Sequence, residues 1–338
     1  MSKVHRVTLD DVAQAAGVAR ATASRALTGS GPVSQTTRTR VEAAAAQLRF
    51  SPHQAARALA SSQAQAIALV IPEPDAFILG DPFLSYVIMG VSEVFHDTTY
   101  QLILVIAHPD DPPTKISQVL RPGYVDGAIV VSQHGSGQIA QAIDEAEIPI
   151  VYIGRPWSGQ SLLYVDVDNR AVGHIATAHL LRQGSRRIAC IAGPVDMSPV
   201  DDRTSGWRAA LSAAGVEPGP LRHSPFTASG GEVSMRSILE SGEPFDAVFA
   251  QSDLMAAGAV RVLTEADLDV PGQVRVVGVD DAEVGRATSP PLTSVTNPAE
   301  ELARGASHML LSILDGEMSS EQIHPQILNP RLIVRESA

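Results

Sequence analysis

The sequence predicts an N-terminal all-α head of about 50 residues, followed by an α/β core built from two doubly wound parallel-sheet subdomains. Residues 8–49 carry apolar side chains at helical spacing, whereas the chain from Ala66 onwards alternates short apolar runs with helical patterns. A length of 338 residues is enough for two or three domains, so a head and a divided core are expected.

The charge is divided in the same way as the fold. Residues 1–62 carry eight Lys and Arg against three Asp and Glu, a net charge of +5, which leaves 17 against 34, or −17, for the rest of the chain. A basic head on an acidic body is typical of a nucleic-acid-binding module joined to another domain. On charge alone, a solvated basic face remains an equal alternative.

Three short helices are expected in the head. Thr8 and Asp11 form the pattern of a capping box, which starts a helix that ends at Gly17. Further helices are expected over about residues 20–27 and 34–48. Two short helices joined by a turn with Gly, supported by a third, indicate a helix-turn-helix headpiece whose second helix reads DNA. A generic three-helix bundle is the alternative.

A fourth, conditional helix is expected after the head. Ser51 as cap and Pro52 at the first helical position predict a helix that ends near Ala60. It is shorter than the roughly 12–15 residues that an isolated helix needs in water, so it should form only when something packs against it.

The core pattern predicts parallel strands that are buried on both faces, with helices between them. The expected strands are 67–72, 102–107, 126–131, 149–154, 188–193, 247–250 and 274–280. These are too many for one small sheet, so two subdomains are expected, with a ligand crevice beside the carboxyl ends of the strands.

Several protein classes do not fit the sequence. The first thirty residues contain no continuous apolar segment, no later run is long enough to span a membrane, and Cys190 is the single cysteine, so we expect a cytoplasmic protein without a membrane partner. A secreted solute-binding protein would need a signal and no basic head. No P-loop, H-E-x-x-H, nucleophile elbow or paired Cys and His spacing occurs, so no enzyme activity, cofactor or metal is expected.

Residues 7–59 resemble the LacI/GalR family of transcriptional regulators. The segment VTLDDVAQAAGVARATASRAL is similar to the family pattern V-T-L/I-x-D-V-A-x-x-A-G-V-S-x-x-T-V-S-R-x-L, and the A-R-x-L hinge pattern follows at 56–59. The resemblance extends to the C-terminus and implies a core of periplasmic-binding-protein-like type. It implies a head over 1–50, a hinge over 51–64, an N-subdomain over 65–165 completed by about 296–325, and a C-subdomain over 166–295 completed by about 326–338.

The same resemblance implies which residues contact DNA. Arg20, Ala21 and Thr22 match positions that face base edges, and the remaining matches, at the phosphate backbone or in the hinge, are Thr8, Ser24, Arg25, His53, Ala56 and Leu59. Arg20 is the strongest candidate for reading a base, because an Arg binds guanine bidentately. Leu59 matches a leucine that wedges into the minor groove, with hinge-on-hinge packing as the alternative. Ala19, Ala23 and His53 replace the family's usual Ser, Val and Asn.

The resemblance also implies an effector crevice. The matching residues are Phe83, Arg155, Arg203, Phe226, Ser252, Asp253, Asp280 and Asn297. Arg and Asp on facing walls hydrogen-bond adjacent hydroxyls, and an aromatic ring covers the apolar face of a sugar or a base. Arg155 and Ser252 stand where some sugar-binding relatives carry Asp and Asn. A sugar or sugar derivative is favoured over a purine, and a purely structural role remains open for Arg203, Phe226 and Asp280.

Taken with the residues, the resemblance implies a sequence-specific DNA-binding regulator, with repression as the expected mode. Its expected partners are a near-palindromic operator, a small polar effector and a second copy of the chain in a homodimer or higher assembly. A DNA-binding protein without a sensor is a poor alternative, because it would not need some 270 acidic α/β residues.

Overall fold

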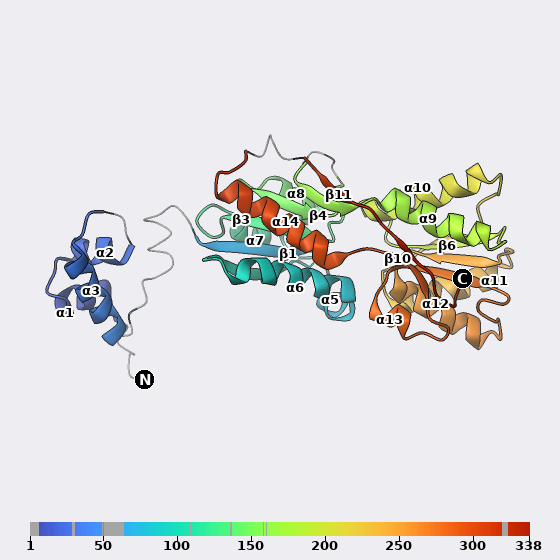
Figure 1. Cartoon of the computed structure of the whole chain (residues 1–338), viewed down its shortest axis with the longest axis horizontal. Helices are drawn as coiled ribbons and strands as arrows, with labels where there is room; N and C mark the ends of the chain where they lie inside the picture. Colours follow the sequence, from blue (N-terminus) through green and yellow to red (C-terminus); the bar gives the residue numbers. More distant parts are fainter. Residues whose placement is uncertain are drawn as a thin grey trace.

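The computed structural model describes residues 7–28, 31–48, 50, 64–108, 110–135, 137–157, 159, 161–319 and 324–338. It contains a helical head and an α/β core with two sheets (Figure 1). The expected hinge helix, with His53, Ala56 and Leu59, lies outside these residues.

The head contains the three expected helices, α1 (Leu9–Ala15), α2 (Arg20–Thr28) and α3 (Gln35–Gln47). The capping box is confirmed, since Thr8 Oγ1 accepts from Asp11 N and the Asp11 carboxylate accepts from Thr8 N at 2.7 Å. A small core of apolar side chains holds the three helices together, and Ala23 is fully buried within it. The replacement of the family's usual Val by Ala23 therefore falls on a packing position.

The first sheet is entirely parallel, in the order β11-β5-β4-β3-β1-β2. Its strands are β1 (Ala66–Ile71), β2 (Gln101–Ile106), β3 (Gly127–Val131), β4 (Ile150–Ile153), β5 (Tyr164–Val167) and β11 (Gln326–Leu328). Its helices are α5 (Asp75–Gly80), α6 (Pro82–His96), α7 (Pro113–Val119), α8 (Gln138–Asp144) and α14 (Ala299–Leu314).

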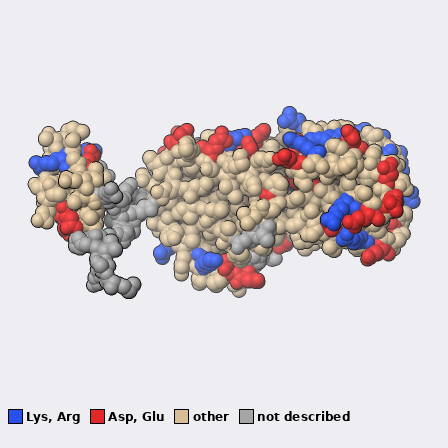
Figure 2. Space-filling view, turned by 90° about the horizontal axis from the view of Figure 1, so that it is seen from below, with Lys and Arg blue, Asp and Glu red and all other residues tan. Residues whose placement is uncertain are grey.

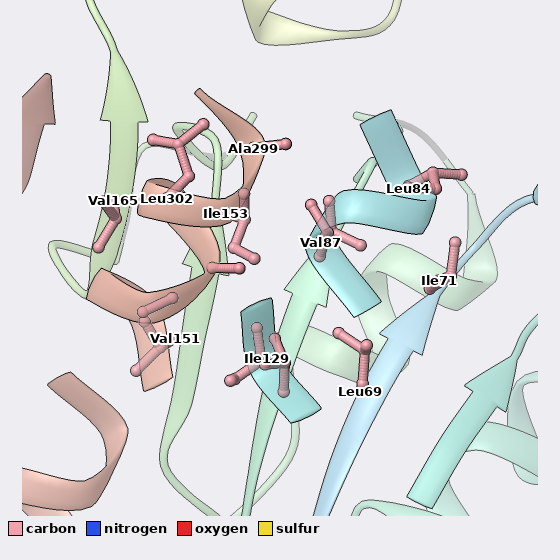
Figure 3. Close-up of a cluster of buried hydrophobic side chains, with 14 of the residues drawn as sticks. Leu69, Ile71, Leu84, Val87, Ile129, Val151, Ile153, Val165, Ala299 and Leu302 are labelled. Carbon is pink, nitrogen blue, oxygen red and sulfur yellow. The ribbon is translucent and has the colours of Figure 1, made fainter. Parts of the chain in front are cut away.

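Side chains that alternate along the strands of this sheet form two separate cores. Leu69 and Ile71 of β1 pack with α6 and α14 on one face (Figure 3), whereas Ala68 and Val70 pack with α7 and α8 on the other. Successive residues of a strand point to opposite faces, so a strand covered by helices on both sides must be apolar throughout.

The second sheet has the order β12-β10-β9-β8-β6-β7 and is parallel except for its edge strand β12. Its strands are β6 (Ile188–Ala192), β7 (Leu221–His223), β8 (Ala247–Ala250), β9 (Arg275–Asp280), β10 (Thr293–Thr296) and β12 (Leu332–Ile333). Its helices are α9 (Asn169–Arg182), α10 (Ser198–Ala213), α11 (Ala228–Ser241), α12 (Asp253–Glu265) and the short α13 (Glu283–Arg286). The pairs α9 with α10 and α11 with α12 cover opposite faces of the sheet.

Glycines allow α9 and α10 to cross at very short range. A Cβ at Gly173 would overlap the carbonyl oxygen of Arg203, and one at Gly206 would overlap that of Arg170. The absence of these side chains brings the two backbones into contact and so sets the position of Arg203.

The chain passes between the sheets after β5, β10 and β11. Sheet membership changes slightly later than expected: Asp166 and Val167 still pair within the first sheet, and residues 326–328 pair with β5 rather than joining the second sheet. The expected boundaries at 165 and 325 therefore lie two and three residues before the ends of β5 and β11. No helix of the described residues is long and apolar enough to cross a membrane.

Candidate functional site

A crevice lies between the two sheets, where the carboxyl ends of strands from both meet. It contains about 790 Å³ of empty space, counted out to its opening and including open solvent. Of the effector residues expected from the sequence, the structure brings together at this crevice Phe83, Arg155, Arg203, Phe226, Ser252, Asp280 and Asn297.

Arg203 is a buried cation in the wall of the crevice. Its Nε donates to Asn169 Oδ1 at 2.8 Å, and its Nη1 donates to the carbonyl oxygen of Gln251 at 2.6 Å. Asn169 is held in turn, because its Nδ2 donates to Asp166 Oδ1 at 2.9 Å. Within the described residues Nη2 has no protein hydrogen-bond partner, so this nitrogen is available to a ligand.

Acidic side chains from both subdomains line the same crevice as this cation. Asp280 Oδ1 accepts from Asn297 Nδ2 at 3.0 Å, and Asp81 Oδ1 accepts from the Phe83 amide at 2.9 Å as the cap of α6. Burial raises the pKa of Asp280 to about 6, opposed by Arg203, and burial with repulsion from Asp280 raises the pKa of Asp81 to about 7. Asp280 also has φ +106°, a backbone conformation that L-residues rarely adopt.

The crevice also has apolar walls. Phe83 and Phe226 line it, and the Phe226 ring packs against the backbone of Gly193, where any side chain would overlap it. Ser252 lies at the start of α12 and caps it, accepting from the Met255 amide at 3.2 Å. Ring-shaped ligands with polar edges suit such a combination of aromatic faces and fixed polar groups.

Arg155 lines the crevice, but the structure pairs it across the two subdomains. Its Nη2 donates to Asp202 Oδ2 at 2.8 Å, and its backbone amide donates to Asp166. The Asp202 carboxylate holds the pKa of Arg155 above its usual value. A ligand would therefore compete with Asp202 for this guanidinium.

Asp253 does not reach the crevice, contrary to the expectation from the sequence. Its carboxylate accepts from Ser294 Oγ at 2.8 Å and from the Ala282 amide at 2.8 Å, and the side chain is completely buried. These bonds connect the start of α12 to β10 and to the segment that follows β9. The carboxylate fits there because the neighbouring Gly278 and Gly285 have no side chains.

Five polar lining residues were not expected from the sequence: Asp81, Ser132, Gln133, Asp166 and Asn169. Asp81 had a usable signal, because an Asp-Pro pair before an apolar helix marks the N-cap of that helix. Ser132 and Gln133 follow β3 and Asn169 follows β5, whereas Asp166 lies within β5, a strand that was not expected. The described residues contain no cluster of His, Cys, Asp and Glu that could hold a metal ion.

The head presents its expected DNA-contact residues around the start of α2. Arg20 and Ala21 are exposed at the first turn, and Arg20 lies 3.5 Å from Asp10 in a solvent-exposed ion pair. Thr22 and Ser24 are partly exposed, and Arg25 Nε donates to the carbonyl oxygen of Ala21 at 3.2 Å. Both signs of charge occur on the surface of the head and on the surface of the core (Figure 2).

The Ala19 substitution removes a side-chain cap from this helix. The Ala19 carbonyl accepts the first helical bonds, from the amides of Thr22 and Ala23, but its methyl group cannot accept from a free amide as Ser would. The first turn of α2 therefore has no side-chain cap from residue 19.

A helix-turn-helix head joined to a two-subdomain core with a ligand crevice defines a DNA-binding transcriptional regulator. A model of bacterial regulatory proteins of the lacI family matches residues 8–53, and a model of the periplasmic binding protein-like domain matches residues 177–338. The chain is 38% identical over 341 residues to the HTH-type transcriptional regulator CelR of Thermobifida fusca, with all of both chains covered. The chain therefore belongs to the LacI family, and the expected fold class is confirmed.

Two further comparisons agree. The ribose operon repressor of Escherichia coli K12 is 32% identical over 339 residues, covering 98% of this chain and 99% of that protein. The solved structure of a transcriptional regulator CelR–cellobiose complex superposes with a TM-score of 0.77 at 36% identity, covering 98% of this chain and 100% of that chain.

Proposed function

We propose that this regulator represses transcription in the cytoplasm and that a neutral sugar, bound in the crevice, controls its affinity for the operator. The observation that carries this proposal is that the buried Arg203 and the half-buried Asp280 line one crevice together with Phe83 and Phe226. Neighbouring hydroxyls of a sugar donate to the carboxylate and accept from the guanidinium, while a phenylalanine ring covers the apolar face of the sugar.

Charge narrows the class of effector. Three carboxylates, Asp81, Asp166 and Asp280, line the crevice beside Arg203, and Arg155 is already paired with Asp202. An anionic effector such as a sugar phosphate would meet uncompensated repulsion, whereas an uncharged polyol offers donors to each carboxylate. The complex of the relative CelR with cellobiose makes cellobiose the first ligand to test, with a purine as the alternative.

We infer the DNA contacts from the head. Arg20, Ala21 and Thr22, at the exposed start of α2, face the bases, whereas Thr8, Ser24 and Arg25 contact the phosphate backbone. In the hinge, His53, Ala56 and Leu59 are assigned to the minor groove on the family pattern alone. Two such heads in a homodimer require a near-palindromic site.

Pairing of two cores is supported by exposed apolar side chains on α5 and α6. Leu79 and Met89 are more than half exposed, and Tyr86 lies between them in the chain. Burying such a face against a second copy removes apolar surface from water. Sedimentation of the full chain should give a dimer, and charged substitutions at Leu79 and Met89 should shift it towards monomer.

The proposed function is tested with the full chain in two steps. Calorimetry against cellobiose, cellobiose phosphate and a purine should give heat with the neutral sugar and none with its phosphate. Selection from random duplex DNA should return a near-palindromic site, and the sugar should alter binding to that site. Binding of the purine in place of every sugar would overturn the effector class, and recovery of no preferred site would overturn the DNA assignment.

A further inference from the structure

His134 lies between two carboxylates at the edge of the crevice. Its Nδ1 is 3.0 Å from Asp196 Oδ2, and its Nε2 is 3.2 Å from Glu73 Oε1. Glu73 follows β1 and His134 follows β3, both in the first subdomain, whereas Asp196 belongs to the second subdomain, between β6 and α10. The imidazole therefore joins one subdomain to the other.

The geometry requires the ring to carry both protons. An ionised carboxylate only accepts hydrogen bonds, and a neutral imidazole donates from one nitrogen alone. With an acceptor at each nitrogen, only the imidazolium satisfies both contacts. The two carboxylates raise the pKa of His134 to about 9, with Glu73 contributing most and burial opposing the shift.

Contacts within the first subdomain alone hold Glu73 in place. It is buried, and its Oε1 also accepts from Ser132 Oγ at 3.0 Å. Ser132 has φ +60°, the left-handed region, which is uncommon for residues other than glycine. The first subdomain thus presents a fixed, charged imidazolium to Asp196.

Two other contacts cross the same edge. The Gly135 amide donates to the carbonyl oxygen of Asp196 at 2.7 Å, and Arg155 pairs with Asp202 six residues further on. Gln133 and Met197, the immediate neighbours of His134 and Asp196, line the crevice, while His134 and Asp196 themselves line a separate hollow beside α8. The pair therefore lies at the boundary of the crevice.

We propose that His134 is a positioning residue, the charged centre of a clasp formed with Glu73 and Asp196 that holds this edge of the crevice closed and slows the release of the effector. The inference rests on the proposed function for its effect on the effector, but the clasp itself can be measured without any ligand. Glu73 and Asp196 are the charged groups that face His134, and the other residues lining the hollow are neutral.

The sign of the pH dependence follows from the charge. The clasp is complete while His134 is protonated, at pH values well below 9, and its grip on Asp196 is lost as the pH rises through that value. Opening of the edge should therefore accompany deprotonation. Trp157 reports it, because its ring lies directly against Gly135, where a side chain would overlap it.

The clasp is tested in the full-length, ligand-free protein by NMR titration of His134, with Asp196→Asn and, as a matched control, Glu243→Gln. Glu243 pairs with Arg222 inside the second subdomain, so its loss removes a carboxylate without touching the interface. We expect His134 to titrate near pH 9 in the wild type and the control, and at lower pH in Asp196→Asn. Trp157 emission is recorded in a Trp207→Phe background. It should change over the same pH range in the proteins that keep Asp196 and not in Asp196→Asn.

The second arm measures dissociation of cellobiose by stopped flow. Asp196→Asn and His134→Gln should each release it about threefold to tenfold faster, the range for a charge-assisted bond that is partly exposed, while Glu243→Gln should not. Because the two variants change opposite sides of the contact, the test still works if one of them fails to fold. If cellobiose does not bind the wild type, the proposed effector fails, and the titration and Trp157 still decide the clasp. An unchanged His134 pKa in Asp196→Asn, or unchanged release from both variants, would overturn the inference.

Discussion

The replacement Asp81→Asn should increase stability at neutral and alkaline pH. Asp81 caps α6 through Oδ1, which accepts from the Phe83 amide at 2.9 Å, and an Asn side chain offers the same oxygen. The change therefore removes a charge and keeps the cap. Burial, repulsion from Asp280 and repulsion from Glu73 together raise the pKa of the carboxyl from 3.8 to about 7.

The size of the effect follows from this pKa. A rise of roughly three pKa units at about 1.4 kcal/mol each corresponds to at most about 4 kcal/mol. Because the folded-state pKa is raised, the protonated form is favoured by folding, and its contribution is complete below pH 3.8. It is lost as the pH rises to about 7, and above that value the ionised carboxylate destabilises the fold. Asn does not titrate, so the variant should match the wild type near pH 4 and exceed it by up to about 4 kcal/mol at pH 8.

Urea unfolding followed by circular dichroism from pH 4 to pH 8 measures this difference. Asp168→Asn is the matched control, because Asp168 caps α9 through the Ala171 amide in an exposed position. Asp280 and Asp166 also have raised pKa values, so Asp81→Asn should flatten the pH dependence without removing it. If Asp81→Asn follows the wild-type curve at every pH, burial and repulsion from Asp280 do not raise the pKa of Asp81 and the reasoning is wrong.

Three further predictions address the ligand, the fold and the DNA. Arg203→Ala should weaken effector binding about tenfold to a hundredfold by calorimetry while leaving operator affinity intact, and normal binding would move the site elsewhere. Gly173→Val should lower the free energy of unfolding by about 1–3 kcal/mol or more, because the new side chain meets the Arg203 carbonyl, whereas the exposed Gly184→Asn should have a smaller effect. In gel-shift assays Arg20→Ala should relax preference at one base pair, whereas Arg25→Ala should weaken all sequences alike; the same pattern from both would contradict their assigned roles.

The head could be predicted from sequence because its signals are local. The capping box of Thr8 and Asp11 acts over three residues, and the breaks at Gly17 and before Ser34 separate helices that are found where expected. The strands β1, β3, β6 and β8 were also recognisable, because burial on both faces leaves an uninterrupted apolar run. Such features depend on neighbouring residues and not on the path of the chain.

The edge and boundary strands could not be predicted in the same way. β5 contains Asp166, β7 is only three residues long, and β11 is mostly exposed. These strands exist because the chain returns to an available sheet edge, which is a property of the tertiary path. The late change of subdomain after Val167 and Leu328 has the same origin.

The sequence by itself determined the class of protein, the basic head, the doubly wound core and seven of the nineteen residues that line the crevice. Only the tertiary structure decided what each side chain does there. The Asp253 carboxylate accepts hydrogen bonds from Ser294 and Ala282, and Arg155 is paired with Asp202. It alone showed that Asp81 and His134 face charges on the opposite subdomain. The physical reason is that hydrogen bonding and charge depend on partners far away in the chain, whereas helix caps and apolar runs depend on neighbours.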